Sequence, residues 1–193
     1  MPPPDIRSAR KAETQKVMDC MTLAFTADPS FRYWWPDPSD YLHWFPKFAL
    51  AMGERGFDHD TVHATANFEA AAMWLPPGVA HDPARVAALD LPSDEETDKI
   101  SREVERAMAS YHPKVPHWYL WMIGVDPRCQ GKGHGSALLK HMLDRCDRER
   151  MPAYLESSTP KNVPLYERHG FEVVGLIEVR DVPPITPMLR RAR

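Results

Sequence analysis

Three glycines at alternate positions, Gly131, Gly133 and Gly135, stand where a strand-like run of residues gives way to a helix-like one. The run before them is His117–Val125 (HWYLWMIGV), and the run after them is Ser136–Cys146 (SALLKHMLDRC). Glycine permits left-handed backbone torsions and lets a ligand approach the main chain closely. Because the first amides of a helix lack partners and the helix dipole favours an anion there, this pattern predicts a phosphate or pyrophosphate site.

Two common phosphate-binding motifs do not fit this loop. A P-loop needs Gly-Lys followed by Ser or Thr, whereas Lys132 is followed by Gly133. A dinucleotide-binding fold needs G-x-G-x-x-G with an acidic residue about 20 positions later. Glu156 falls roughly there, but the glycine spacing is different. The string from Gln130 to Gly135, QGKGHG, fits the pattern Q/R-x-x-G-x-G/A instead.

This last pattern is the pyrophosphate-binding signature of the GNAT superfamily of N-acetyltransferases, which the chain resembles. The downstream segment Pro152–Phe171 (PAYLESSTPKNVPLYERHGF) is similar to the family's fifth strand and the helix that follows it, with its asparagine and tyrosine. The resemblance is close from Trp118 to about Val179 and looser in the N-terminal part. The strings LESS and NVPLYERHGF look similar to the puromycin N-acetyltransferase-like branch.

The resemblance implies acetyl-CoA as cosubstrate and no metal. The pyrophosphate would bind main-chain amides of the loop, to which Lys132 could add charge. The pantetheine arm would pair with the end of the fourth strand, where the fourth and fifth strands splay apart. Asn162 would bind pantetheine, cap the helix that begins there, or do both. The expected cofactor-binding residues are Ile123, Gly124, Val125, Gln130, Gly131, Lys132, Gly133, His134, Gly135, Ser136, Asn162 and Tyr166.

Three residues are candidates for proton transfer: Tyr166, Glu156 and His117. Tyr166 follows Asn162 by one helical turn, so both can face the same side. The resemblance implies that this tyrosine protonates the leaving thiolate, although a packed core tyrosine is the alternative. The family's usual glutamate on the fourth strand is missing, because His117–Val125 contains no acid. Glu156 on the fifth strand or His117, an imidazole that titrates near neutral pH, is then the base, and a water chain without a single base stays open.

Aromatic residues are dense in the segment Phe31–Trp35 (FRYWW), which lies where the family places acceptor recognition. Phe31, Tyr33, Trp34 and Trp35 are therefore expected to line an apolar or aromatic acceptor pocket. The alternative is that they form the core between helices and sheet. No acidic cluster in this stretch suits a polycationic aminoglycoside, so we expect a small, partly aromatic or apolar primary amine as acceptor.

Composition and charge describe a soluble globular protein. The chain has 193 residues, with 43% hydrophobic and 26% charged residues and a net charge of −3. This balance gives no strong basic field for nucleic acid or an anionic membrane. No apolar run approaches the ~20 residues that span a bilayer, and the N-terminus lacks a signal-peptide core. Three widely spaced cysteines favour a reducing cytoplasm without disulfides or zinc. We expect a monomer or homodimer.

The pattern of elements predicts an α/β fold with a mixed sheet in one domain, residues 1–193. By the resemblance, residues 1–116 form the acceptor side and residues 117–193 the acetyl-CoA half, around a mostly antiparallel sheet. Strands are expected at Ile6–Ala9, Thr61–Ala66, Glu69–Leu75, His117–Val125, Ala153–Ser157, Glu172–Val179 and Thr186–Arg191. Helices are expected at Ala12–Thr26, from Ser39 or Asp40 to Arg55 with a kink or break at Pro46, and at Pro83–Leu89, Ser93–Tyr111, Ser136–Glu149 and Val163–His169.

Three functional readings follow. The first is an acetyl-CoA-dependent N-acetyltransferase that acts on a small amine by direct attack in a ternary complex. The second is a protein N-terminal or lysine acetyltransferase, which needs an open groove. The third is an acyl-CoA-binding sensor with a degenerate site, against which the joint presence of Tyr166, Asn162 and Glu156 argues.

Overall fold

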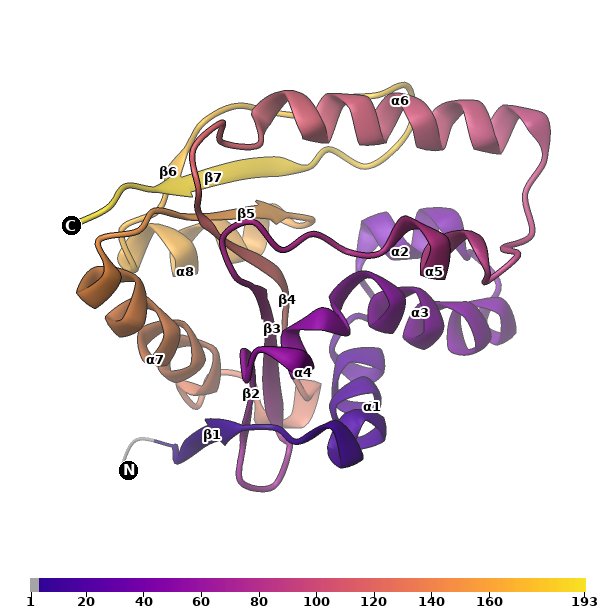
Figure 1. The fold of residues 1–193 in the computed structure, drawn as a ribbon. Helices are drawn as coiled ribbons and strands as arrows, with labels where there is room; N and C mark the ends of the chain where they lie inside the picture. Colours follow the sequence, from indigo (N-terminus) through magenta and orange to yellow (C-terminus); the bar gives the residue numbers. More distant parts are fainter. Residues whose placement is uncertain (1–3) are drawn as a thin grey trace.

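A seven-stranded sheet forms the centre of the computed structural model, which describes residues 4–193 (Figure 1). The strand order is β1-β2-β3-β4-β5-β7-β6. The strands are β1 (Ile6–Ser8), β2 (Val62–Thr65), β3 (Ala70–Leu75), β4 (Trp118–Val125), β5 (Ala153–Ser157), β6 (Glu172–Val173) and β7 (Thr186–Arg190). The helices are α1 (Thr14–Ala24), α2 (Pro29–Trp34), α3 (Pro38–Gly53), α4 (Arg55–Asp58), α5 (Pro83–Ala87), α6 (Glu95–Tyr111), α7 (His134–Glu149) and α8 (Val163–Arg168), with 3-10 turns η1 (Lys11–Glu13), η2 (Pro127–Cys129) and η3 (Pro160–Asn162).

Only β4 and β5 pair in parallel, and every other neighbouring pair in the sheet is antiparallel. A parallel pair needs a crossover connection, which α7 supplies between these two strands. The predicted fold class, a mixed and mostly antiparallel sheet flanked by helices, is confirmed.

The two parallel strands separate after a short ladder. Their pairing runs from Trp118 opposite Ala153 to Leu120 opposite Leu155. Beyond Leu120, β4 continues to Val125 against β3 alone, while β5 continues against β7. A bulge marks the same place, because Met73 pairs with Met122 but Trp74 pairs with Leu120, which leaves one extra residue on β4. The sheet therefore opens into a V at its centre.

Helices cover both faces of the sheet. On one face α7 packs against a core that includes Trp118, Leu120 and Leu155. On the other, α1 and α3 pack over Met73 and Met122 (Figure 1). The end of α1 lies so close to β4 that a Cβ at Gly124 would come within 2.7 Å of the Ala24 side chain. A glycine is therefore needed there, and the contact holds the α1–α2 turn beside the V.

The long connection between β6 and β7 packs against α6 instead of extending the sheet (Figure 1). The predicted strand Glu172–Val179 is wrong in length, since β6 ends at Val173 and only an isolated bridge joins Ile177 to Ile185. Burial of Ile177, Val182 and Ile185 against α6 explains the departure. Ion pairs from Arg180 to Glu96 and Glu103 add a polar rim.

Two local details differ from expectation. Pro46 does not split α3, which runs unbroken from Pro38 to Gly53. The carbonyl that Pro46 deprives of a donor belongs to Leu42, which is 60% exposed, so water can satisfy it. The N-cap of α6 is Asp94, whose carboxylate accepts from the Thr97 amide, and not Ser93.

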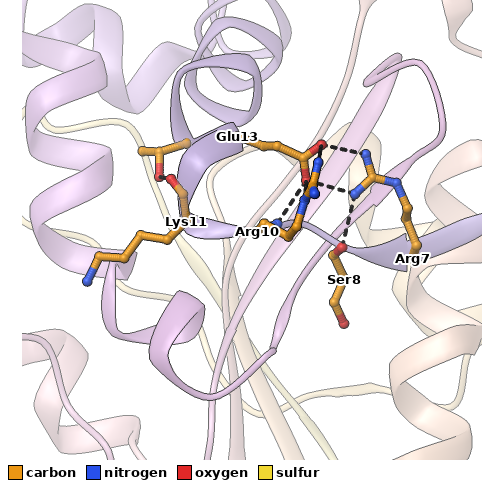
Figure 2. A network of polar contacts seen from close by, with 6 residues as sticks. Arg7, Ser8, Arg10, Lys11 and Glu13 are labelled. Atoms are coloured by element: carbon orange, nitrogen blue, oxygen red, sulfur yellow. Dashed lines mark hydrogen bonds and ion pairs between the residues drawn. The ribbon is translucent and has the colours of Figure 1, made fainter.

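The start of α1 is tied to β1 by a polar cluster around Glu13 (Figure 2). Both carboxylate oxygens of Glu13 accept hydrogen bonds of 2.8 Å from the guanidinium of Arg7, and the main-chain amide of Arg10 donates another of 2.9 Å. These donors hold the pKa of Glu13 well below its usual value. The cluster fixes where α1 begins, and thus where its far end meets β4.

Candidate functional site

The glycine loop between β4 and α7 has the backbone that an anion site requires. Gly131 and Gly133 adopt left-handed torsions, with φ of 74° and 86°. A Cβ at either position would meet no atom within 4 Å, so open space lies above both residues. The first helical hydrogen bond of α7 runs from the Ala137 amide to the Gly133 carbonyl. The amides of residues 134–136 therefore precede the helical ladder and are available to a ligand.

Side chains of the loop support its shape. The Gln130 amide donates to the Val125 carbonyl over 3.4 Å, and the Ser136 hydroxyl lies 2.7 Å from Nε2 of His169 on the turn after α8. Lys132 is exposed on the loop, where its ammonium can meet a phosphate. Within residues 4–193, Nδ1 of His134 is buried without a hydrogen-bond partner.

The end of β4 offers an unpaired edge beside this loop. Ile123, Gly124 and Val125 pair with β3 on one side. On their other side no strand of residues 4–193 pairs with them, because β5 has turned away. An extended arm can add to such an edge through main-chain hydrogen bonds. The open space above Gly131 and Gly133 and this free edge together fit a CoA-like molecule, with pyrophosphate at α7 and pantetheine along β4.

Tyr166 lies in α8 and is buried, with 5% of its surface exposed. Its ring packs against Phe171, with the ring centroids 6.1 Å apart. Burial and the negative charge of Asp28 raise the pKa of Tyr166 well above its usual value, so the residue stays a phenol and can donate a proton. Asn162, one turn earlier, is exposed and its side chain makes no capping hydrogen bond. Its amide is therefore free for a ligand.

Asp28 joins the acceptor side of the molecule to the end of β5. Its carboxylate caps α2 by accepting from the amides of Ser30 (3.0 Å) and Phe31 (3.2 Å), and it accepts a hydrogen bond from the Ser158 hydroxyl. Burial raises the pKa of Asp28. After burial, the charge of Asp28 is also the second cause of the raised pKa of Tyr166.

Glu156 lies at the apex of the V. It is the first residue of β5 beyond the ladder with β4, and it pairs with Pro187 of β7. Its side chain is only 4% exposed, and its one ion-pair contact in the described chain is His112, with Nε2 3.1 Å from Oε1. The angles at this contact are not those of a hydrogen bond, so Oε1 keeps an unfilled acceptor site.

Tyrosines surround this carboxylate. Burial is the larger cause of the raised pKa values of Tyr119 and Tyr154, and the negative charge of Glu156 raises both further. The Tyr154 hydroxyl is itself buried without a partner among residues 4–193. Two unpartnered polar atoms, Glu156 Oε1 and Tyr154 Oη, thus share one cluster, which favours a ligand or water between them.

His117 stands just before β4, at the edge of the same cluster. Its Nδ1 lies 2.8 Å from the Val115 carbonyl, which makes Nδ1 the protonated atom of the neutral ring. Burial lowers the pKa of His117. Its ring centroid is 5.6 Å from that of His112 and 5.9 Å from that of Tyr154, so it contacts the cluster through aromatic rings.

The aromatic segment divides into two parts. Phe31 and Trp35 stack with centroids 6.4 Å apart, and Trp35, 7% exposed, belongs to the core under α1 and α3. Tyr33 and Trp34 are half-buried and also pack against the α6 cluster. The Tyr33 hydroxyl donates to Asp181 over 2.9 Å, which joins α2 to the β6–β7 connection. Tyr33 and Trp34 thus lie on the side of α2 that meets α6 and the β6–β7 connection.

Sequence reasoning missed two members of the site, Asp28 and His112. Asp28 carries a local signal, since Asp-Pro before a short aromatic run is a helix N-cap pattern. That pattern indicates a cap and does not indicate a contact with Ser158. His112 follows the last turn of α6 and has no motif around it. Only the packing of α6 over β5 brings it to Glu156.

Other features of the described residues bound the possible chemistry. Residues 4–193 contain no group of three or more His, Cys, Asp or Glu side chains placed to hold a metal. No helix in that range is long and apolar enough to cross a membrane. A cavity of about 470 Å³ lies near the β2–β3 turn, lined among others by Arg7, Lys16 and Phe68. None of the site residues predicted from the sequence lines this cavity.

Comparison with known proteins gives a family match over most of the chain. The model of the acetyltransferase (GNAT) family matches residues 28–171. An uncharacterized N-acetyltransferase of Schizosaccharomyces pombe is 46% identical over 54 residues, 28% of this chain and 22% of that protein. A mycothiol acetyltransferase of Propionibacterium freudenreichii is 39% identical over 64 residues, 31% of this chain and 20% of that protein. The chain thus matches about a fifth of the length of these relatives.

Several solved structures superpose on nearly the whole chain. A histone acetyltransferase HPA2 and related acetyltransferase from Corynebacterium glutamicum has 25% identity and a TM-score of 0.65, covering 98% of this chain and 97% of that one. A mosquito arylalkylamine N-acetyltransferase like 5b has 14% identity and a TM-score of 0.65, covering 97% and 99%. An agmatine N-acetyltransferase has 12% identity and a TM-score of 0.63, covering 98% and 99%. At these low identities the last two share the fold alone.

Proposed function

We propose that this chain, which belongs to the acetyltransferase (GNAT) family and is an acetyl-transferring enzyme, acetylates the primary amine of a small, aromatic or apolar molecule. The observation that carries the proposal is the position of Glu156, a buried carboxylate at the point where β4 and β5 separate. It has no lysine or arginine partner in the described chain, so a substrate ammonium can meet it without displacing an internal cation.

The residues proposed to hold acetyl-CoA are those of the glycine loop and the free β4 edge. Amides of residues 131–136 would bind the pyrophosphate, with Lys132 adding charge, and Ile123–Val125 together with Asn162 would bind pantetheine. Acetyl-CoA, when bound, supplies an acetyl group activated as a thioester. The remaining steps belong to side chains of this protein.

Two proton movements are required at the acceptor nitrogen. An alkylammonium must lose a proton before it can attack, and Glu156 is proposed as the base that takes it, with His117 nearby. Tyr166 is proposed as the acid whose Oη proton neutralises the leaving thiolate. Its raised pKa keeps it protonated until then, and the second proton of the nitrogen restores it.

The acceptor class follows from the side chains that bound the site. Tyr33 and Trp34 offer aromatic surface, and Asp28 and Glu156 offer negative charge at the V. The hydrogen bond from Tyr33 to Asp181 links α2 to the β6–β7 connection. We propose that this link narrows the acceptor side, which supports a small amine over the long peptide that a protein acetyltransferase binds.

A panel of amines with acetyl-CoA and a thiol reporter tests the proposal. The panel contains 2-phenylethylamine, tryptamine, agmatine and a lysine-containing peptide. Burying one aromatic ring is worth a few kcal/mol at most, so we expect kcat/KM for the arylalkylamines to exceed that for agmatine by about tenfold or more. Preference for the peptide would support a protein acetyltransferase. Binding of CoA without turnover of any amine would support a sensor.

A further inference from the structure

The imidazole of His112 connects the buried carboxylate of Glu156 to solvent. Nε2 of His112 lies 3.1 Å from Oε1 of Glu156, and 32% of the His112 side chain is exposed against 4% for Glu156. A separation of this size is within the reach over which a proton passes once donor and acceptor are aligned. Among the described residues His112 is also the only ion-pair partner that Glu156 has.

Other titratable groups around the pair are less suited to carry a proton outward. Tyr119 from β4 and Tyr154 from β5 face the carboxylate, but burial raises the pKa of both phenols. Tyr111, in the last turn of α6, also raises the pKa of Tyr154, as the smallest of its causes. His117, just before β4, has its Nδ1 hydrogen-bonded to the Val115 carbonyl, and its ring contacts His112 and not Glu156.

We propose that His112 is a positioning residue that holds Glu156 at the V and carries the acceptor's proton from that carboxylate to solvent. The inference rests on the proposed function. An alkylammonium becomes an amide by losing two protons from nitrogen. One restores Tyr166 after that phenol has protonated the thiolate. The other passes to Glu156 and then to Nε2 of His112, while the proton on Nδ1 leaves to a buffer base. In total, one ammonium and one thioester react to give one amide, one thiol and one released proton.

The side-chain chemistry fits this role because imidazole gives and takes protons near neutral pH. A carboxylate that is 96% buried cannot exchange its proton directly with buffer, since little of its surface meets water. His112 stands at the C-cap of α6, with its amide bonded to the Met108 carbonyl, so its backbone is fixed by the helix. Loss of the ring therefore removes the route without removing the base.

Buffer rescue tests the route. His112→Ala and His112→Gln are compared with wild type at low buffer concentration, with the amine of the panel above that turns over fastest. We expect kcat to fall by about 10-fold to 100-fold in both variants while the acetyl-CoA KM stays within about threefold. Added imidazole should restore kcat of His112→Ala with a saturating dependence and should restore His112→Gln less, because glutamine fills the space. Wild type should not respond.

Two further variants separate the possible failures. His59→Gln, an exposed histidine in the turn before β2, is the matched control and should match wild type. Glu156→Gln should lose activity that imidazole cannot restore. If Glu156→Gln is active, the proposed base is wrong. If Glu156→Gln is inactive while both His112 variants keep kcat within twofold in single turnovers, or lose it with no response to imidazole, only the His112 route is overturned. A panel without turnover overturns both.

Discussion

The hydroxyl of Ser158 donates a hydrogen bond to the carboxylate of Asp28, two residues that are 130 positions apart in the chain. Through this contact the turn between α1 and α2 is fastened to the end of β5, beside the opening of the sheet. The Asp28 carboxylate performs two tasks at once, because it also caps α2. One side chain thus joins the α1–α2 turn and the cap of α2 to the end of β5.

Two replacements of Asp28 test whether the cap of α2 or the charge stabilises the fold. Asp28→Ala should lower the free energy of unfolding by about 1–2 kcal/mol, because the cap of α2 is lost and a buried acceptor disappears. Asp28→Asn should cost less, since asparagine caps as well as aspartate. Chemical denaturation with both variants measures the difference. Equal losses would contradict the capping role and show that the charge itself matters.

Tyr166→Phe should lower kcat by about 10²-fold to 10⁴-fold, because a positioned acid is lost. The acetyl-CoA KM should change little, and the melting temperature should hold because only the hydroxyl of a packed ring is removed. Steady-state and single-turnover kinetics measure the effect. A kcat within threefold of wild type in single turnovers would rule out Tyr166 as the acid.

The raised pKa of Tyr166 also fixes a pH dependence. Tyr166 must stay protonated to act as the acid, so its ionisation should cause no loss of kcat below about pH 10, the ordinary pKa of tyrosine. Any loss of kcat at lower pH should remain in Tyr166→Phe.

Gly133→Glu should abolish the rise in melting temperature that CoA produces. A carboxylate would then occupy the open space above the loop, where the pyrophosphate is proposed to bind. For wild type, ligand at a hundred times Kd should add about 2.7 kcal/mol. Gly78→Glu is the matched control, because Gly78 has a similar φ of 79° and equally open surroundings outside the site. If both variants lose the CoA response, backbone strain and not the carboxylate is the cause.

Trp34 and Trp35 should respond differently to truncation. Trp34→Ala should raise the KM of an arylalkylamine with little change in the acetyl-CoA KM, since Trp34 is half-buried toward α6. Trp35→Ala should cost about 3–5 kcal/mol of stability, since Trp35 is buried in the core. Steady-state kinetics and chemical denaturation of both variants measure these two effects. A stable Trp35→Ala protein with a raised amine KM would reverse the two roles.

Acid should destabilise the fold through His63, which is buried in β2 beside His141. Burial lowers the pKa of His63 from 6.5 to about 4. Between pH 6.5 and pH 4, His63 is therefore protonated in the unfolded chain and neutral in the folded chain. Stability therefore falls as pH drops from about 6.5 to 4, on the order of 3 kcal/mol at 1.36 kcal/mol per unit. His63→Gln should flatten the curve of unfolding free energy against pH, whereas His59→Gln should not. An unchanged slope in His63→Gln would exclude His63 as the source.

Local patterns in the sequence determined much of the fold and named part of the candidate site. The glycine loop, the strand before it and α7 after it could be read because torsion freedom, apolar runs and helix periodicity act within a few residues. The mixed, mostly antiparallel sheet followed from the same local signals together with the family resemblance. The resemblance named Tyr166 and Asn162 as candidates, and their spacing of one helical turn let the sequence place them on the same side.

Tertiary packing decided the rest, because contacts between distant segments leave no periodic trace. The V between β4 and β5 arises from unequal ladders, three residues with β4 against the full length with β7. That geometry turns Glu156 from an ordinary strand residue into a buried carboxylate. The packing of α6 brings His112 to it, and the approach of α1 to Gly124 brings Asp28 to Ser158. Trp35 is buried and its neighbour Trp34 is half-buried because only one side of this short helical segment meets the core.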